Sequence, residues 1–268
     1  MPSVAVQSGP TRLIVQARAW APAAAALLDH LGVGPGWVCA DLGCGPIGIL
    51  DLLARRVGRH GTVVGVDRDL EALLAALTAV RRLPNVSLAP AEVTRTGLPR
   101  GEFDLVHARL VCQEAGPGRL LDEMIALVKP GGVVILEEPG PELWAIDPAP
   151  PGYQAIARRV AAAFLRRRSG IGPALPGQFR RRGLIGIECR QHRLRFRGGH
   201  PYATMPLFAL AALRTRLLEA GLASVRDLAR LAAGLVEASR SGKVRHHTFP
   251  LWQVSGRRRG GRRLSGPR

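Results

Sequence analysis

The sequence predicts an α/β fold in which a mostly parallel sheet carries helices on both faces. Three observations support this prediction. Short, continuous, β-branched apolar runs recur through the first half of the chain, amphipathic or Ala/Leu-rich segments separate them, and a glycine-rich turn follows the first run. Such runs are typical of strands buried on both faces. Strands that alternate with helices imply right-handed crossovers and therefore a doubly wound, parallel sheet.

The first half of the chain alternates regularly between the two kinds of element. An Ala-rich amphipathic helix is expected over residues 11–31, before the first strand. Strands are then expected at 38–41, 63–66, 85–88, 103–107 and 133–136. Helices are expected between them at 49–57, 70–82 and 120–128.

The second half has a different pattern. Residues 139–152 are rich in proline and are expected to form a loop. The segments that follow read as a helix, a loosely alternating strand, two helices and a closing strand, at 154–168, 185–197, 204–220, 225–239 and 248–254. Residues 257–268 are basic with almost no large apolar side chain, so this tail is expected to be disordered.

A glycine-rich turn follows the first strand, with the sequence Asp41-Leu42-Gly43-Cys44-Gly45-Pro46-Ile47-Gly48. The second strand ends at Asp67, 19 residues beyond Gly48. Glycines let the backbone turn tightly and approach a ligand closely, and an acid about 20 residues further on can accept hydrogen bonds from a ribose diol. The spacing therefore predicts a nucleoside-containing ligand.

Two other interpretations of this turn are a strand-to-helix connection without a ligand and a nicotinamide or flavin site. In a dinucleotide site the pyrophosphate lies on the helix N-terminus. Asp41, two residues before the first glycine, would repel a pyrophosphate but suits a ligand with a cationic amino-acid tail. Pro46 also leaves fewer amide donors than a phosphate cradle needs.

The segment Asp41-Leu42-Gly43-Cys44-Gly45-Pro46 resembles the first motif of the class I S-adenosylmethionine-dependent methyltransferases of small-molecule type. Phe103-Asp104-Leu105-Val106 and Lys129-Pro130-Gly131-Gly132 resemble later signatures of that family, so the resemblance covers about residues 36–138. It implies a Rossmann-like sheet of seven strands whose last strand is antiparallel. It also implies a cap helix, a cofactor-binding core, a helical lid with the closing strands, and a tail, at 1–35, 36–140, 141–256 and 257–268.

The resemblance further implies which residues hold S-adenosylmethionine. Asp67 matches the acid that binds the ribose hydroxyls, and Glu92 stands where an acid, more usually Asp, contacts the adenine amine. The expected cofactor-binding residues are Asp41, Gly43, Cys44, Gly45, Gly48, Asp67, Arg68, Ala91, Glu92 and Ala108.

The ends of the fourth and fifth strands offer candidates for acceptor chemistry, because ligands bind outside the carboxyl ends of strands in open sheets. His107 is the candidate general base by position and by its ordinary pKa; the alternative is a structural histidine bonded at the strand end. Arg109 is expected to hold an anionic acceptor or to form a salt bridge. Gln113, Glu138 and Trp144 complete the expected acceptor site, with helix capping and ordinary packing as alternatives for Gln113 and Trp144.

The positive charge is concentrated in the second half of the chain. Residues 1–150 contain 13 basic and 16 acidic side chains, whereas residues 151–268 contain 25 and 4, and the net charge is +18. Such asymmetry favours contact with nucleic acid or an anionic surface. However, 36 of the 38 basic residues are arginine, which G+C-rich codons favour, so codon bias accounts for part of the excess.

Several classes of protein do not fit the sequence. The four cysteines have no CxxC spacing, so neither a zinc site nor a disulfide framework is expected. No run of about 20 apolar residues predicts a membrane span, and no secretory signal is evident, so a cytoplasmic location is expected. Nothing in the sequence indicates an oligomeric state.

The expected function is methyl transfer from S-adenosylmethionine to a small organic acceptor, at oxygen, nitrogen or carbon, by SN2 displacement at the sulfonium methyl group. One alternative is an RNA methyltransferase that uses the basic C-terminal half. The other is a methyltransferase-like protein that binds S-adenosylmethionine without methylating anything.

Overall fold

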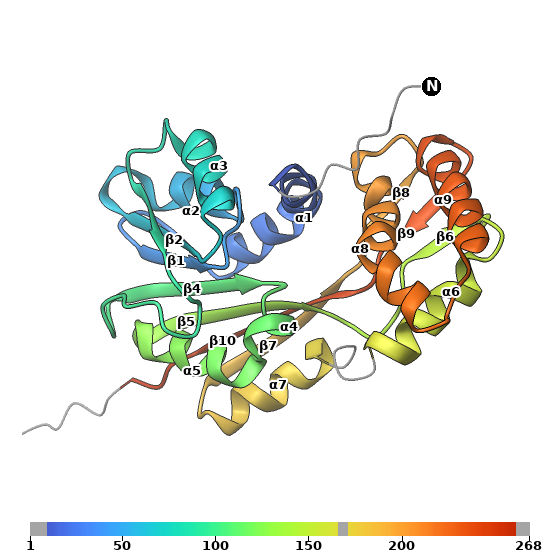
Figure 1. The fold of residues 1–268 in the computed structure, drawn as a ribbon. Coiled ribbons are helices and arrows are strands. Elements are labelled where there is room, and N and C mark those ends of the chain that lie inside the picture. The colour runs from blue at the N-terminus through green and yellow to red at the C-terminus, as the bar shows by residue number, and fades with distance from the viewer. Residues whose placement is uncertain (1–9, 166–170, 261–268) are drawn as a thin grey trace, which may run out of the picture.

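In the computed structural model, which describes residues 10–165 and 171–260, the chain forms two lobes (Figure 1). A large lobe contains the main sheet and the helices that cover it. A smaller lobe contains helices and a short second sheet, and α1 (Pro10–His30) lies between the two.

The main sheet has seven strands within the described residues, in the order β3-β2-β1-β4-β5-β10-β7. Strand β10 runs antiparallel to both of its neighbours, whereas the pairs from β3 to β5 are parallel. The expected mostly parallel, seven-stranded, Rossmann-like sheet is therefore confirmed. The strands are β1 (Val38–Leu42), β2 (Thr62–Asp67), β3 (Val86–Pro90), β4 (Phe103–Arg109), β5 (Val128–Pro139), β7 (Ile185–His192) and β10 (Leu251–Arg257).

Helices cover both faces of this sheet because each presents an apolar stripe to it. One face carries α1, α2 (Leu50–Val57) and α3 (Leu70–Val80), and the short η1 turn (Gly58–His60) follows α2. The other face carries α4 (Cys112–Ala115), α5 (Pro117–Leu127) and α7 (Ile171–Arg181). Two apolar clusters, one on each face, form the core of the large lobe.

The smaller lobe has a three-stranded antiparallel sheet in the order β6-β9-β8 among the described residues. Its elements are β6 (Ala145–Asp147), α6 (Tyr153–Val160), the π-helical η2 (Ala161–Leu165), β8 (Arg195–Arg197), η3 (Pro201–Thr204), α8 (Met205–Glu219), α9 (Val225–Arg240) and β9 (Arg245–His247). Leucines of α8 and α9 pack with Ile146 and Ile156 in a separate apolar core. The expected helices 204–220 and 225–239 are thus present, and they pack away from the main sheet.

Three expectations about the second half need correction. The proline-rich segment 139–152 contains β6, which pairs with a distant strand. The single strand expected at 185–197 is two strands, β7 in the main sheet and β8 in the small one. Helix α7 was not expected, because prolines and glycines interrupt its helical pattern, yet it buries Leu175 and Phe179 against the sheet.

The ends of two expected segments also differ. The helix expected at 154–168 is regular only through α6, and η2 follows; residues 166–168 lie outside the described residues. The tail expected at 257–268 begins in ordered structure, since Arg257 ends β10 and Arg258 Nη1 donates to the Val128 carbonyl at 2.7 Å. Residues 261–268 lie outside the described residues, so the rest of the expected disordered tail stays a prediction.

The packing of α7 leads to a test of the large-lobe core. Phe179 is 0% exposed, and a Cβ built on Gly256 of β10 would lie 2.9 Å from its ring. We expect Phe179→Ala to lower the free energy of unfolding by about 3–5 kcal/mol, because the cavity left behind cannot collapse fully. Leu74→Ala is the control, since Leu74 is 65% exposed and its loss costs less than about 0.5 kcal/mol. Urea unfolding followed by circular dichroism measures both; similar midpoints for the two variants would contradict this account.

Candidate active site

A cavity of about 1160 Å³ begins at the carboxyl ends of β1, β2 and β4 and extends into the smaller lobe. Most of the residues expected to bind the cofactor line its first end. These are Asp41, Gly43, Cys44, Gly45, Gly48, Asp67, Arg68 and Glu92. Arg109, Gln113 and Trp144, expected at the acceptor site, also line it.

The turn after β1 depends on its glycines for dihedral angle and for space. Gly43, Gly45 and Gly48 have φ values of 71°, 52° and 49°, a region that favours glycine. A Cβ on Gly48 would also collide with Oδ2 of Asp41. That oxygen accepts a hydrogen bond from the Ile49 N–H at 3.0 Å, which ties Asp41 to the end of the turn. Residue 48 must therefore lack a Cβ, because a Cβ there would displace the Asp41 carboxylate.

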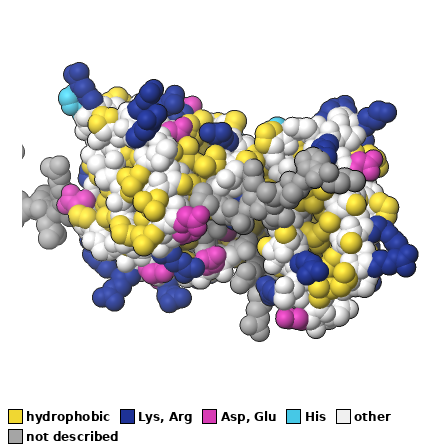
Figure 2. Space-filling view, turned by 45° about the horizontal axis from the view of Figure 1, so that its top comes forward, with side chains coloured by type: hydrophobic (Ala, Val, Ile, Leu, Met, Phe, Trp, Pro, Cys, Tyr) yellow, Lys and Arg dark blue, Asp and Glu magenta, His cyan; other side chains and the backbone are white. Residues whose placement is uncertain are grey.

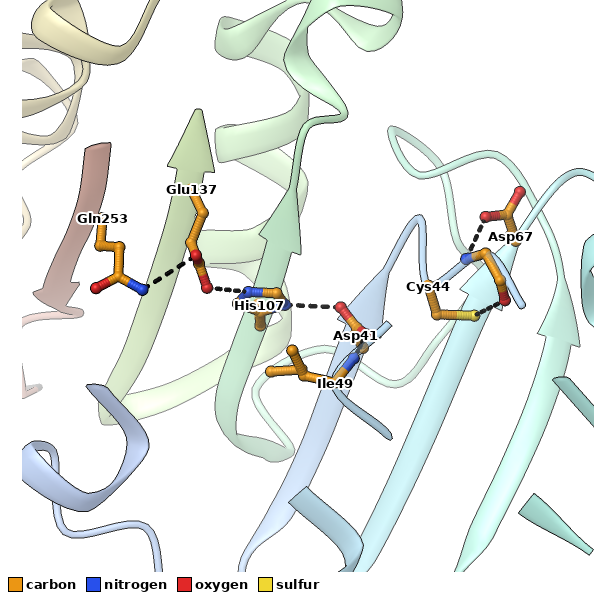
Figure 3. A network of polar contacts seen from close by, with 8 residues as sticks. Asp41, Cys44, Ile49, Asp67, His107, Glu137 and Gln253 are labelled. Carbon is orange, nitrogen blue, oxygen red and sulfur yellow. Dashed lines mark hydrogen bonds and ion pairs between the residues drawn. The ribbon is translucent and has the colours of Figure 1, made fainter. Parts of the chain in front are cut away.

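Asp67 ties the end of β2 to the same turn. Its Oδ2 accepts from the Gly45 N–H at 2.8 Å and its Oδ1 accepts from the Asp69 N–H at 3.0 Å (Figure 3 shows the first contact). The Ala91 N–H donates to the Asp67 carbonyl at 3.0 Å, which places Ala91 beside this corner. A carboxylate with free lone pairs therefore lies at the edge of the cavity.

Four side chains from four neighbouring strands form a buried polar chain through the sheet (Figure 3). His107 Nδ1 contacts Asp41 Oδ1 at 2.7 Å, and His107 Nε2 contacts Glu137 Oε1 at 2.9 Å. Gln253 Nε2 donates to Glu137 Oε2 at 3.1 Å. All four residues are at most 2% exposed. The register produces this alignment, because Asp41 pairs with His107 across β1 and β4, and Glu137 pairs with Gln253 across β5 and β10.

The charges along this buried polar chain alternate in sign. Burial alone would lower the pKa of His107, but the charges and hydrogen bonds of Asp41 and Glu137 outweigh it and raise the pKa to about 9. Burial alone would raise the pKa of Glu137, but His107 and, to a smaller extent, Arg109 and Gln253 lower it. His107 is therefore a cation between two carboxylates at neutral pH.

This geometry argues against His107 as a general base. Both of its ring nitrogens already contact carboxylates, and the ring is protonated at neutral pH. These contacts match the alternative considered from the sequence, a structural histidine bonded at the end of the strand. Asp41 contacts both the turn and the imidazolium, because its Oδ2 accepts from the Ile49 N–H and its Oδ1 contacts His107 Nδ1.

Three expected site residues, Ala91, Ala108 and Glu138, do not line the cavity. Glu138 is 0% exposed, and its Oε1 accepts from the Val111 and Cys112 N–H groups at 2.9 and 2.8 Å. Burial raises its pKa to about 7, although these hydrogen bonds oppose the shift. Glu138 thus holds the start of α4 through Oε1, while its Oε2 is buried without a hydrogen-bond partner among the described residues. Ala108 is also 0% exposed and packs in the core, so it has no surface for a cofactor.

Exposed ion pairs lie at the rim of the first end. Arg68 Nη2 lies 2.7 Å from Glu114 Oε2, and Arg68 Nη1 lies 3.4 Å from Glu92 Oε1. Arg68 therefore joins the segment after β3 to α4, and Gln113 lies beside this contact. Exposed pairs of this kind contribute little to stability, so their effect is on the shape of the rim.

The cavity is also lined by residues that the sequence did not identify. Tyr202 of η3 and Arg12 of α1 line it together with Arg109. The Tyr202 hydroxyl accepts from Trp20 Nε1 at 3.0 Å, and its ring lies 5.1 Å from that of Trp144. No local motif marks Arg12 or Tyr202, because only the packing of α1 and η3 near the end of β4 brings them together.

Other kinds of site are not evident in the described part of the chain. No group of three or more His, Cys, Asp or Glu side chains could hold a metal ion there. None of the helices in residues 10–165 and 171–260 is both long enough and apolar enough to cross a membrane.

Comparison with known proteins agrees with the geometry. Residues 40–136 match the family described as "Methyltransferase domain", and this range contains the glycine turn, Asp67 and the parallel strands β1 to β4. The matched segment is a methyltransferase domain of the class I S-adenosylmethionine-dependent type. The resemblance noted from the motifs at 41–46, 103–106 and 129–132 is therefore confirmed, and the family binds S-adenosylmethionine.

Relatives of this methyltransferase differ in how much of the chain they match. Nocamycin O-methyltransferase of Saccharothrix syringae is 29% identical over 89% of this chain and 91% of its own length. An uncharacterized 37.1 kDa protein of transposon TN4556 from Streptomyces fradiae is 33% identical over 45% of this chain but only 35% of its own length. A phosphoethanolamine N-methyltransferase 2 of Haemonchus contortus has a similar fold, with 19% identity and a TM-score of 0.55 over 90% of this chain and 53% of its own length.

The tight contact under Gly48 predicts that this methyltransferase cannot accept a side chain there. We expect Gly48→Ala to weaken S-adenosylhomocysteine binding by at least about tenfold, because the added Cβ displaces Asp41 and with it the turn. Gly101→Ala is the matched control: Gly101 also has positive φ, at 71°, but a Cβ there meets nothing within 4 Å. Calorimetric titration measures both; equal affinities would show that the collision is relieved at no cost.

The buried charges predict a pH dependence of stability. The pKa of His107 is raised from 6.5 to about 9, so its stabilising contribution is complete below about pH 6.5 and is lost as the pH rises through about 9. We expect the stability difference between wild type and His107→Gln to shrink by about 3 kcal/mol between pH 6.5 and 10. Denaturant unfolding at several pH values measures it, and titrating groups that are not coupled to His107 cancel in the difference. A difference that stays constant over this range would contradict the assignment.

Proposed function

We propose that this methyltransferase transfers the methyl group of S-adenosylmethionine to an oxygen atom of a small, largely apolar organic acceptor. The observation that carries the proposal is one continuous cavity that begins at the glycine turn and ends in an apolar chamber of the smaller lobe. The similarity to nocamycin O-methyltransferase over 89% of the chain supports oxygen as the acceptor atom.

The residues at the first end fit the cofactor. The glycines at 43, 45 and 48 have left-handed backbone conformations and carry no side chains, which lets the amino-acid part of a ligand approach the backbone at these positions. Asp67 has lone pairs left to accept hydrogen bonds from ribose hydroxyls, and Glu92 stands at the rim beside it. When bound, S-adenosylmethionine supplies a methyl group activated by a positively charged sulfur.

The chamber at the other end suits an apolar molecule. Its walls come from the loop after β5, from α6, α8 and α9, and from the segment between β9 and β10, so they are assembled from distant segments of the chain. They include Leu143, Trp144, Ile156, Val160, Met205, Leu210, Leu213, Leu217, Leu231, Leu235 and Phe249. Pockets lined in this way bind through burial of apolar surface, at about 25 cal/mol per Å².

The contribution of the protein is alignment and exclusion of water. Methyl transfer needs the acceptor atom in line with the methyl group, and a walled chamber next to the cofactor end restricts that approach. The described residues include no free histidine base at this point, because His107 is held between Asp41 and Glu137. Catalysis by position rather than by acid–base transfer therefore fits the site.

The distribution of charge favours a small acceptor over RNA. On the face drawn in Figure 2, Lys and Arg side chains form scattered groups and no continuous stripe. The chamber walls are mostly aliphatic, whereas RNA-binding sites stack bases on aromatic side chains and follow the backbone with positive charge.

Asp67 provides a binding test of the proposal. We expect Asp67→Ala to weaken S-adenosylhomocysteine binding by about tenfold to hundredfold, as a charged acceptor for two ribose hydroxyls is lost. Asp122→Asn on α5 is the control, because Asp122 is exposed and, among the described residues, pairs only with Arg182. Absence of any S-adenosylhomocysteine binding by the wild type would overturn the proposed function.

The acceptor class needs a transfer experiment. Wild-type protein is incubated with methyl-labelled S-adenosylmethionine and either a small-molecule cell extract or total RNA. We expect label to appear in the small-molecule fraction. Label in RNA would contradict the proposal, and so would intact cofactor binding without transfer to either fraction, which is the behaviour of a non-methylating binder.

A further inference from the structure

Two arginines that line the cavity, Arg12 and Arg109, form no ion pair with a carboxylate among the described residues. Arg109, at the end of β4, is half-buried, and its Nη1 is fully buried without a hydrogen-bond partner. Arg12 of α1 is also half-buried and forms no ion pair among the described side chains. Buried or half-buried guanidinium groups are normally paired, because desolvation of an unpaired charge is costly. The unpartnered Nη1 of Arg109, and the absence of an ion pair at Arg12 among the described residues, point to a ligand that supplies acceptor groups.

Tyr202 lies close to both arginines. Burial raises the pKa of its hydroxyl to about 12, while the hydrogen bond from Trp20 and the positive charges of Arg109 and Arg12 oppose that rise. Both guanidinium groups are therefore within electrostatic range of the Tyr202 oxygen. Because this oxygen accepts from Trp20, its own hydrogen is left to donate. Arg12, Arg109 and Tyr202 together form a donor cluster, hereafter the Arg12–Arg109–Tyr202 cluster.

The local charges leave room for an anion. The buried polar chain contains two carboxylates, Asp41 and Glu137, and one cation, His107, so it has one excess negative charge. The positive charge of Arg109 acts on Glu137 and balances this excess. Arg12 then adds an uncompensated positive charge. Glu142 also lines the cavity, but it lies 3.8 Å from Arg193 in an exposed pair.

The cavity also offers no free group to remove a proton from an acceptor. Every carboxylate among the described lining residues already contacts a cationic side chain or backbone N–H groups; they are Asp41, Asp67, Asp69, Glu92, Glu114 and Glu142. The Tyr153 hydroxyl donates to the Trp144 carbonyl at 2.6 Å. An acceptor oxygen that is already ionised at neutral pH needs no such base.

We propose that the acceptor is a small apolar molecule with an oxyanion, a carboxylate or a comparably acidic enol, which binds against the Arg12–Arg109–Tyr202 cluster while its apolar body fills the chamber. This inference rests on the proposed function and narrows its acceptor class. Arg109 can present two parallel N–H groups to a carboxylate, which makes it the main determinant of the preference for an anion.

The test compares two probes of the same shape, cinnamate and its neutral amide cinnamamide, by calorimetric titration of protein saturated with S-adenosylhomocysteine. We expect the wild type to bind cinnamate at least about tenfold more tightly than cinnamamide. Arg109→Gln removes this preference, and Arg12→Gln reduces it by about threefold or more. Arg214→Gln is the matched control: Arg214 is exposed on α8 of the smaller lobe, and its loss changes the net charge equally without altering the preference.

The outcomes separate the two proposals. Titration with S-adenosylhomocysteine alone reports on the proposed function, and we expect its affinity to stay within about twofold in all three variants. Bound S-adenosylhomocysteine with equal affinity for both probes, or with no cinnamate binding, overturns the oxyanion inference and leaves the proposed function intact. An equal loss of preference in Arg214→Gln would also overturn it, because the effect would then come from net charge. If Arg109→Gln fails to fold, Arg12→Gln still decides the result.

Discussion

The contact between the His107 ring and its two carboxylates connects the parts of the large lobe on which the site depends. Asp41 shapes the glycine turn, His107 lies at the centre of the sheet, and Glu137 and Gln253 extend the chain to the antiparallel strand. Ionised groups in a dry interior are tolerated only when each is paired and hydrogen-bonded. The alternating signs satisfy this condition, and removal of one member leaves an uncompensated charge that costs about 3–5 kcal/mol. The turn is therefore held by the sheet and not only by its own backbone.

Much of the large lobe could be predicted because its signals are local. Continuous apolar runs identified β1 to β5, and the spacing from Gly48 to Asp67 identified one end of the cavity. The smaller sheet could not be predicted, since β6, β8 and β9 have three residues each and pair over long separations in sequence. The role of His107 depends on the register of β1 against β4, which no local pattern contains. Arg12 and Tyr202 were missed for the same reason.

The two ends of the cavity have different origins in the chain. The family match ends at residue 136, so it includes the glycine turn and Asp67 but stops before every element of the smaller lobe. The acceptor chamber lies in the segment between β5 and β10, apart from the contribution of α1. Strands β7 and β10 then return to the main sheet, which fixes this segment at both ends. The family match thus covers the cofactor end of the cavity, and the main sheet anchors the segment that forms the other end.

The ion pairs of Arg68 differ from the buried chain in how they respond to ionic strength. Arg68 and its partners Glu92 and Glu114 are more than half exposed, whereas the side chains of Asp41, His107 and Glu137 are at most 2% exposed. Salt screens exposed charges over about 8 Å at physiological concentration, but it has little access to the interior. Concentrated salt therefore weakens the ion pairs of Arg68 at the rim of the cavity, whereas the buried pairs of His107 are little affected. Ligand exchange and structural integrity are in this way governed by separate sets of charges.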